Sequence, residues 1–166
     1  MEIFWSELIA GLPTVQDSER ILIRLVASMF LGGIVGLQRE RVGKAAGMRT
    51  HILISISTAL FVLVCTSVDM GLDGLSRVIQ GIATGLGFIG TGTILKRSDK
   101  MEVHGLTTAA GLFLTAAIGV ACGIGRIGLG IVAAAMAWLV LSVLAHLEIY
   151  LNTKDEPDLT AEENKG

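Results

Sequence analysis

Charged residues are scarce in this 166-residue chain, and their scarcity limits the class of protein that it can be. Asp, Glu, Lys and Arg together make up 17% of the sequence, whereas an average soluble domain carries about 25%. Aromatic residues are also few, at 5%, so most of the 52% hydrophobic content is aliphatic. The mean hydropathy is +0.69. So little polar surface cannot cover several helices in water, which favours a membrane protein over a soluble helical bundle.

Carboxylates are missing from the centre of every long apolar run. Magnesium prefers several oxygen ligands, usually including a carboxylate, and proton-coupled pumps usually carry buried acids. Their absence weakens the case for a cation path through the chain. Threonine hydroxyls and backbone carbonyls could still ligate an ion, so magnesium stays an open partner that no obvious ligand residues support.

Catalytic and cofactor motifs are lacking too. No Ser-His-Asp set, paired carboxylates or zinc-like Cys and His spacing can be placed in one cleft. Gly85, Gly87 and Gly90 match GxGxxG, but a dinucleotide site needs a preceding strand and these glycines lie in an apolar run. The two cysteines, Cys65 and Cys122, are either small core residues or a disulfide. We predict that the chain is no enzyme and has no cofactor, and its few basic loop residues predict no nucleic-acid partner.

Five apolar runs dominate the sequence, and each is long enough to cross a bilayer, for which about 20 residues are needed. We therefore predict an all-α, polytopic membrane bundle of about five transmembrane helices, contained in residues 20–151. The runs cover residues 21–37, 52–68, 78–95, 106–122 and 127–151.

Short segments flank this predicted membrane domain. In residues 1–19, Trp5, Leu8 and Leu12 recur at helical spacing before Pro13, which predicts a short interfacial helix on the periplasmic side. Residues 152–166 are acidic and almost without apolar side chains, which predicts a disordered cytoplasmic tail.

Lys and Arg are concentrated in alternate connectors. Four lie in residues 38–50 and three in residues 96–105, whereas the connector between the second and third runs carries only Arg77. Basic connectors stay in the cytoplasm. The pattern therefore predicts an N-terminus outside and, with five spans, a C-terminus in the cytoplasm.

The stretch 81–112 is rich in glycine, threonine and alanine. Small side chains let helices approach closely, and threonine hydroxyls can bond across the contact. We predict that the run at 78–95 is a central helix that packs on two neighbours through two small faces. The predicted helix-packing residues are Gly81, Gly85, Gly87, Gly90, Gly92 and Gly111.

A few polar residues lie within or beside the predicted spans. Arg24 begins a face of small residues at steps of four, which suggests that it points into the bundle, where Asp69 or Asp73 could pair with it. The alternative is that its long side chain reaches the outer surface. The candidate intramembrane polar residues are Arg24, Thr91, Thr93, Thr107 and Thr108.

Basic, acidic and imidazole groups cluster in the two basic connectors, beside predicted helix N-termini that attract anions. Thr50 is also placed to cap the second run. An anionic headgroup, a phosphate or an acidic partner segment would fit here, and the alternative is simple anchoring by basic residues. This predicted functional rim consists of Arg39, Glu40, Arg49, Thr50, His51, Glu102 and His104.

Three motifs in these regions resemble the MgtC/SapB family of bacterial inner-membrane proteins. They read GLQRERVGKAAGMRTH (36–51), GLGFIGTGTIL (85–95) and GLTTAAGLF (105–113). The chain departs from the common family pattern at Gln38, Thr91 and Phe113. At Gln38 the family commonly has glutamate, so an acid-dependent role there does not carry over.

The resemblance implies a multi-pass protein of the bacterial inner membrane that is linked to growth in low magnesium. Better-known members are viewed as regulators that act through other membrane proteins, and they carry a soluble C-terminal domain that we expect this chain to lack. Two hypotheses follow. The chain is a regulator whose partners are membrane lipid, other membrane proteins or a second copy in a homodimer, or it is a transporter or channel for magnesium or another small solute.

Overall fold

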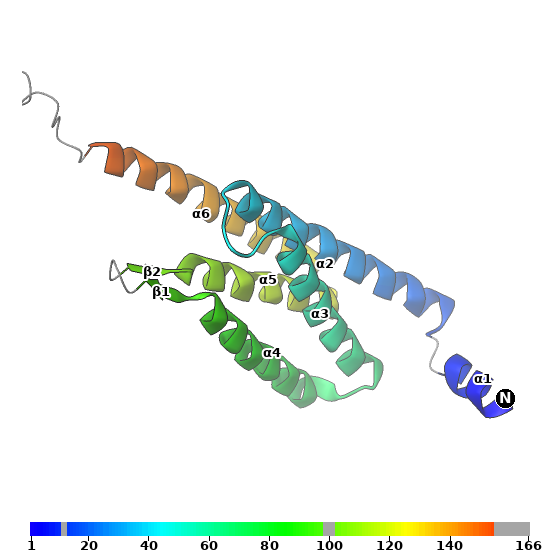
Figure 1. Cartoon of the computed structure of the whole chain (residues 1–166). Coiled ribbons are helices and arrows are strands. Elements are labelled where there is room, and N and C mark those ends of the chain that lie inside the picture. Colours follow the sequence, from blue (N-terminus) through cyan, green and yellow to red (C-terminus); the bar gives the residue numbers. More distant parts are fainter. Residues whose placement is uncertain (11–12, 98–101, 155–166) are drawn as a thin grey trace, which may run out of the picture.

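The computed structural model describes residues 1–10, 13–97 and 102–154, which form helices and one short hairpin (Figure 1). This confirms the predicted all-helical class of the bundle, and the basic connector adds the hairpin. The helices are α1 (Glu2–Ala10), α2 (Val15–Arg41), α3 (Met48–Ser67), α4 (Gly71–Thr93), α5 (Leu106–Ile124) and α6 (Ile127–Lys154). The antiparallel strands β1 (Leu95–Arg97) and β2 (Glu102–His104) pair Leu95 with His104 and Arg97 with Glu102.

The helices match the five predicted runs, and each of α2, α3, α4, α5 and α6 is longer than its run, although α4 ends at Thr93, before the predicted residue 95. α2 begins at Val15, before the predicted domain boundary, and Thr14 caps it by accepting the Asp17 N–H at 3.2 Å. α6 continues to Lys154, past the predicted start of the tail. Residues 155–166, the rest of that predicted tail, lie outside the described residues.

Three helices, α2, α3 and α5, are long and apolar enough to cross a membrane. They carry large exposed apolar side chains such as Leu22, Phe30 and Phe61, each about 60% exposed. Water disfavours such a surface and lipid favours it. Spanning by α4 and α6, and hence the number five, stays a prediction.

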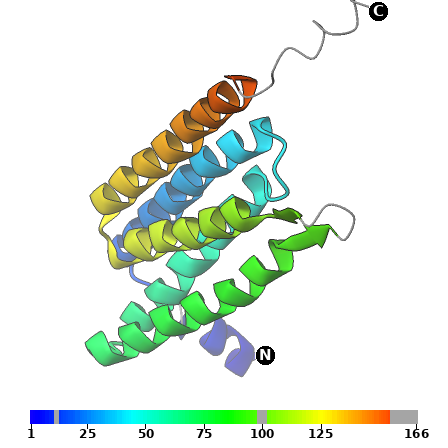
Figure 2. The same ribbon diagram turned by 90° about the vertical axis from the view of Figure 1, so that its left-hand side faces the viewer.

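α5 occupies the centre of the bundle, in contact with α2, α3, α4 and α6. α3 lies between α2 and α5, whereas α4 packs mainly against α3 and α5 and forms one edge (Figure 2). Within the described helix α4, Leu86 and Gly90 alone are buried. The predicted central position of residues 78–95 is therefore wrong, because α3 and α5 occupy it instead.

Successive helices run in opposite directions, so both basic connectors lie at the same end of the bundle (Figure 2). We call this the connector end: α2 and α4 end there, and α3 and α5 begin there. Gly105 closes the hairpin onto α5 with φ +97°, a backbone conformation that glycine alone adopts readily. A Cβ at this position would also collide with the Thr93 carbonyl.

Glycines hold α3 tightly between its two neighbours. On α2, a Cβ at Gly32 would come within 2.7 Å of Ser55 Cβ, and one at Gly36 within 2.6 Å of Met48 Cα. On α5, Gly119 faces the Ser55 carbonyl and Gly123 faces the Ala59 carbonyl. Both pairs have the Gly-x-x-x-Gly spacing that lets membrane helices approach closely.

The predicted packing glycines of α4 make no such contacts. Cβ atoms at Gly81, Gly85, Gly87 and Gly92 would meet nothing within 4 Å, so their predicted role in packing this chain's own helices is wrong. Gly81, Gly85 and Gly92 share one side of α4 and Gly87 lies on nearly the opposite side, and all four are left uncovered because α4 lies at the edge of the bundle. Gly90 and Gly111 do face other helices, at ordinary distances of 3.4 Å from Ala109 Cβ and 3.6 Å from His51 Cε1.

At the end of the bundle opposite the connector end, Arg24 points inward rather than into solvent. Its NH1 group donates to the Gly123 carbonyl at 2.9 Å, so a positive charge meets the C-terminus of α5, where it is favoured. Among the described residues, Arg24 forms no ion pair with Asp69 or Asp73. Cys65 and Cys122 are both buried and free, which leaves them as core residues.

Candidate functional site

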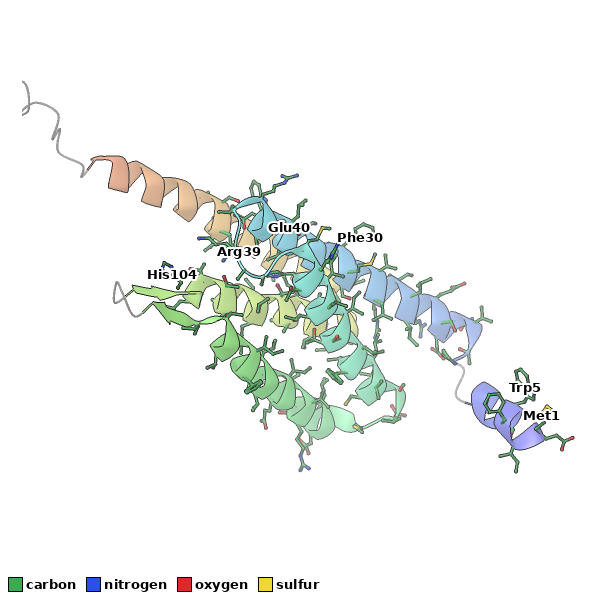
Figure 3. All side chains as sticks on the ribbon, viewed as in Figure 1. Met1, Trp5, Phe30, Arg39, Glu40 and His104 are labelled. Carbon is green, nitrogen blue, oxygen red and sulfur yellow. The ribbon has the colours of Figure 1, made fainter. Side chains whose placement is uncertain are left out.

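The predicted rim divides into an inner and an outer part at the connector end. Arg39 and His51 are buried inside the bundle, whereas Glu40, Arg49 and His104 are exposed and Thr50 is half-buried. Figure 3 shows Arg39 and Glu40 near the end of α2, with His104 on the hairpin. The side chain of Glu102 lies outside the described residues. The inner part is where the structure brings separate helices together.

Arg39 links the end of α2 to the beginning of α5. Its NH2 group donates to Thr108 Oγ1 at 3.1 Å, and both residues are 3% exposed. Of the threonines predicted to lie within the membrane, Thr108 is thus the one that bonds to a residue of the predicted rim. Arg39 Nε has no hydrogen-bond partner.

His51 lies one helical turn deeper, where α2, α3 and α5 meet. Its Nδ1 is 2.7 Å from Thr115 Oγ1, and that hydroxyl donates to the Gly111 carbonyl at 2.9 Å. Because the hydroxyl proton is engaged by Gly111, the Thr115 oxygen accepts a hydrogen bond from Nδ1–H. His51 Nε2 is left without a partner inside the bundle.

Glu40 has a different role from its neighbour Arg39. Its Oε2 accepts the Met48 N–H at 2.8 Å, so a carboxylate from α2 caps the N-terminus of α3. The predicted cap by Thr50 is wrong, because α3 begins earlier, with Gly47 as its N-cap and no side-chain bond from that residue.

Buried hydroxyl groups continue inward from His51 along α3. Ser55 is fully buried with no partner for its Oγ, and Thr58 Oγ1 donates to the Ile54 carbonyl at 2.9 Å. We call Arg39, Thr108, His51, Thr115, Ser55 and Thr58 the polar seam. The close glycine contacts of α2 and α5 around Ser55 leave no open path along this part of the seam.

Sequence reasoning missed Ser55, Thr58 and Thr115 as site residues. A signal for Thr115 was present, because Thr108, Gly111 and Thr115 recur on one face of α5 at helical spacing. The remaining predicted polar residues are not part of the seam: Thr91 and Thr107 are exposed, and Thr93 is half-buried. Thr91 and Thr93 bond only to their own helix.

An apolar groove of about 580 Å³ lies between α3 and α4, on the uncovered side of α4. Gly81 and Gly85 form part of its wall, together with Phe61, Leu86 and Ile89. The groove meets the polar seam at one residue, Thr58, which belongs to its lining. Among the described residues, no group of three or more His, Cys, Asp or Glu side chains is placed to hold a metal ion.

Apolar outward-facing helices around a buried polar seam define a helical membrane protein. The chain belongs to the MgtC family, whose profile matches residues 25–150. It is 40% identical to the protein SrpB of Synechococcus elongatus over 136 residues, which cover 75% of each chain. No solved structure matches it.

Two further relatives carry names that refer to magnesium or to the family. YhiD of Escherichia coli, whose name proposes magnesium transport, is 42% identical over 142 residues, 81% of this chain and 65% of YhiD. Protein MgtC of Salmonella typhimurium is 38% identical over 105 residues, 63% of this chain and 44% of MgtC. The chain therefore spans less than two thirds of the length of these two relatives.

Proposed function

We propose that this chain is a regulatory protein of the bacterial inner membrane that supports adaptation to low magnesium by contacting other membrane proteins. The family and the names of its relatives supply the link to magnesium. We further propose five membrane spans, with the N-terminus outside and the C-terminus in the cytoplasm, since the basic connectors share one end of the bundle.

The observation that carries the regulatory proposal is the uncovered face of α4. Gly81, Gly85 and Gly92 share one side of α4 and meet nothing within 4 Å, and Gly81 and Gly85 line the apolar groove between α3 and α4. Lipid gives no reason to prefer glycine over leucine on a membrane-facing helix, whereas a partner helix does, because glycine permits close approach. A span of another membrane protein, or of a second copy of this chain, fits this face.

The second candidate function is transport of magnesium or another small solute, and the polar seam is the observation that favours it. The seam follows α3 inward from Arg39 past His51 to Thr58. Two features of the seam argue against transport. None of the seam residues is a carboxylate, and the close glycine contacts leave no open path around Ser55. We therefore rank transport below regulation.

A growth assay in low magnesium tests the regulatory proposal. The full chain, produced in a bacterium that lacks its own family member, is compared with Gly85→Leu and with the matched control Gly128→Leu. Both glycines have open space around them, but Gly128 lies on α6, away from the groove. We expect Gly85→Leu to lose growth support at unchanged protein level and Gly128→Leu to keep it.

Purified protein in liposomes separates the two functions. The regulatory proposal expects no more magnesium flux than empty vesicles show. Flux above that level would favour transport instead. Equal growth in low magnesium with Gly85→Leu and with the original chain would contradict the proposal that the α4 face contacts a partner.

A further inference from the structure

An unbalanced positive charge is buried at the connector end. Arg39 is 3% exposed and donates one hydrogen bond, to Thr108, while its Nε has no partner. Within the described part of the chain no carboxylate pairs with it, since the one ion pair there joins Arg20 and Asp17. A buried charge without a counter-charge is costly, so this position favours an anion.

The beginning of α5 adds positive potential at the same place. Thr108 belongs to the first turn of α5, and the first backbone bond there is donated by Ala109 to Gly105. Gly105 has no side chain with which to cap the helix, so the N–H groups of Leu106, Thr107 and Thr108 have no partner among the described residues. Free N–H groups at a helix N-terminus bind anions.

The neighbouring helix provides an internal comparison. α3 also begins at the connector end, but there Glu40 supplies a carboxylate to the Met48 N–H. The two helix starts therefore differ: one already holds an acid from this chain, and the other lies beside a buried arginine. Of the two, the start of α5 is the one on which no carboxylate of the described residues is bound.

We propose that Arg39, the hydroxyl of Thr108 and the first N–H groups of α5 bind a phosphate group. A guanidinium combined with helix N-terminal N–H groups presents several donors to the oxygens of one tetrahedral anion. Leu106 is 58% exposed and Thr107 is exposed, so the ligand enters from the connector end. Both free phosphate and the phosphate of an anionic lipid headgroup have this chemistry, and the site is independent of the α4 face.

Thermal unfolding of the purified full chain tests this site. One arm adds sodium phosphate to the protein in detergent, against sodium chloride at the same ionic strength. The other arm places the protein in phosphatidylcholine nanodiscs with or without phosphatidylglycerol. We expect the melting temperature to rise with ligand in at least one arm, and the responding arm identifies the source of the phosphate.

Arg39→Gln and its neighbour Arg41→Gln form the matched pair of variants. Arg41 is exposed on the same last turn of α2, so its removal lowers the surface charge without touching the site. We expect Arg39→Gln to weaken the apparent affinity at least about tenfold, as for the loss of one partner from a buried charged hydrogen bond. In chloride alone it should unfold no earlier than the original chain, because it removes a buried charge.

No stabilisation in either arm would overturn the proposal, and so would an equal loss of ligand effect in Arg41→Gln, which would indicate general screening. If Arg39→Gln fails to fold, Thr108→Val tests the same site with its shape preserved. An undiminished phosphate effect in Thr108→Val would then refute it. Because no partner protein is present, a negative result here leaves the regulatory proposal standing.

Discussion

Gly119 is the position where one added methyl group tests the packing of the bundle most directly. A Cβ there would collide with Thr58 Oγ1 and the Ser55 carbonyl oxygen, and would lie 3.0 Å from the Ser55 carbonyl carbon. Two of these atoms are backbone, so α3 would have to move away from α5. Overpacking of this kind costs about 1–3 kcal/mol. In a chain of this size each kcal/mol lowers the melting temperature by roughly 2–4 °C.

The matched control is Gly85→Ala, on the uncovered face of α4. Its Cβ meets nothing within 4 Å, and replacing a helical glycine by alanine stabilises by about 0.5–1 kcal/mol. We therefore expect thermal unfolding in detergent to move in opposite directions, down for Gly119→Ala and slightly up for Gly85→Ala. Equal shifts for the two variants would refute the assignment of close packing to α5 rather than to α4.

Three more predictions use the same purified protein. Thr115→Val should lower the free energy of unfolding by about 1–3 kcal/mol, because it leaves His51 Nδ1 buried without a partner; Thr91→Val, on the exposed side of α4, is the control and should change little. Arg49→Ala should change stability by less than about 0.5 kcal/mol, since Arg49 is exposed, yet reduce growth support in low magnesium; equal loss of folded protein would make Arg49 structural. Both cysteine thiols should react with maleimide in detergent-unfolded protein without prior reduction, and labelling that requires a reductant would contradict their free state.

The elements of the fold were predictable because each depends on a local pattern. Apolar runs of membrane length and alternate basic connectors lead to the five long helices and to the shared connector end. The hairpin at 95–104 was not predictable, since strands of three residues each are too short to show a periodic pattern.

The pairing of helices was not predictable from these patterns. α4 and α5 both carry glycine and threonine at helical spacing. Such a pattern predicts which residues share a face of the helix, but it does not predict which other helix packs on that face. In the structure the faces of Gly32, Gly36, Gly119 and Gly123 are covered, and most of the α4 face is not. The Gly-x-x-x-Gly spacing does not separate the two cases, because Gly81 and Gly85 of α4 have it as well as both covered pairs.

The division of the rim has a similar cause. Arg39 and Arg41 look equivalent in the sequence, but two residues along a helix turn the side chain by about 200°, to nearly the opposite face. Whether a face meets α5 or the surroundings depends on the packing of α2. From the sequence both arginines are therefore equal candidates for the site, and only the three-dimensional arrangement shows which of them is buried.

The edge position of α4 has a consequence for how the molecule opens. α2, α3 and α5 share buried side chains and close backbone contacts, so they should unfold locally only as one cooperative unit. α4 buries Leu86 and Gly90 alone among its described residues, and it can detach without disturbing that unit. We expect its amides to exchange hydrogen for deuterium faster than those of α3 and α5, so that the surface offered to a partner is also the least rigid part of the bundle.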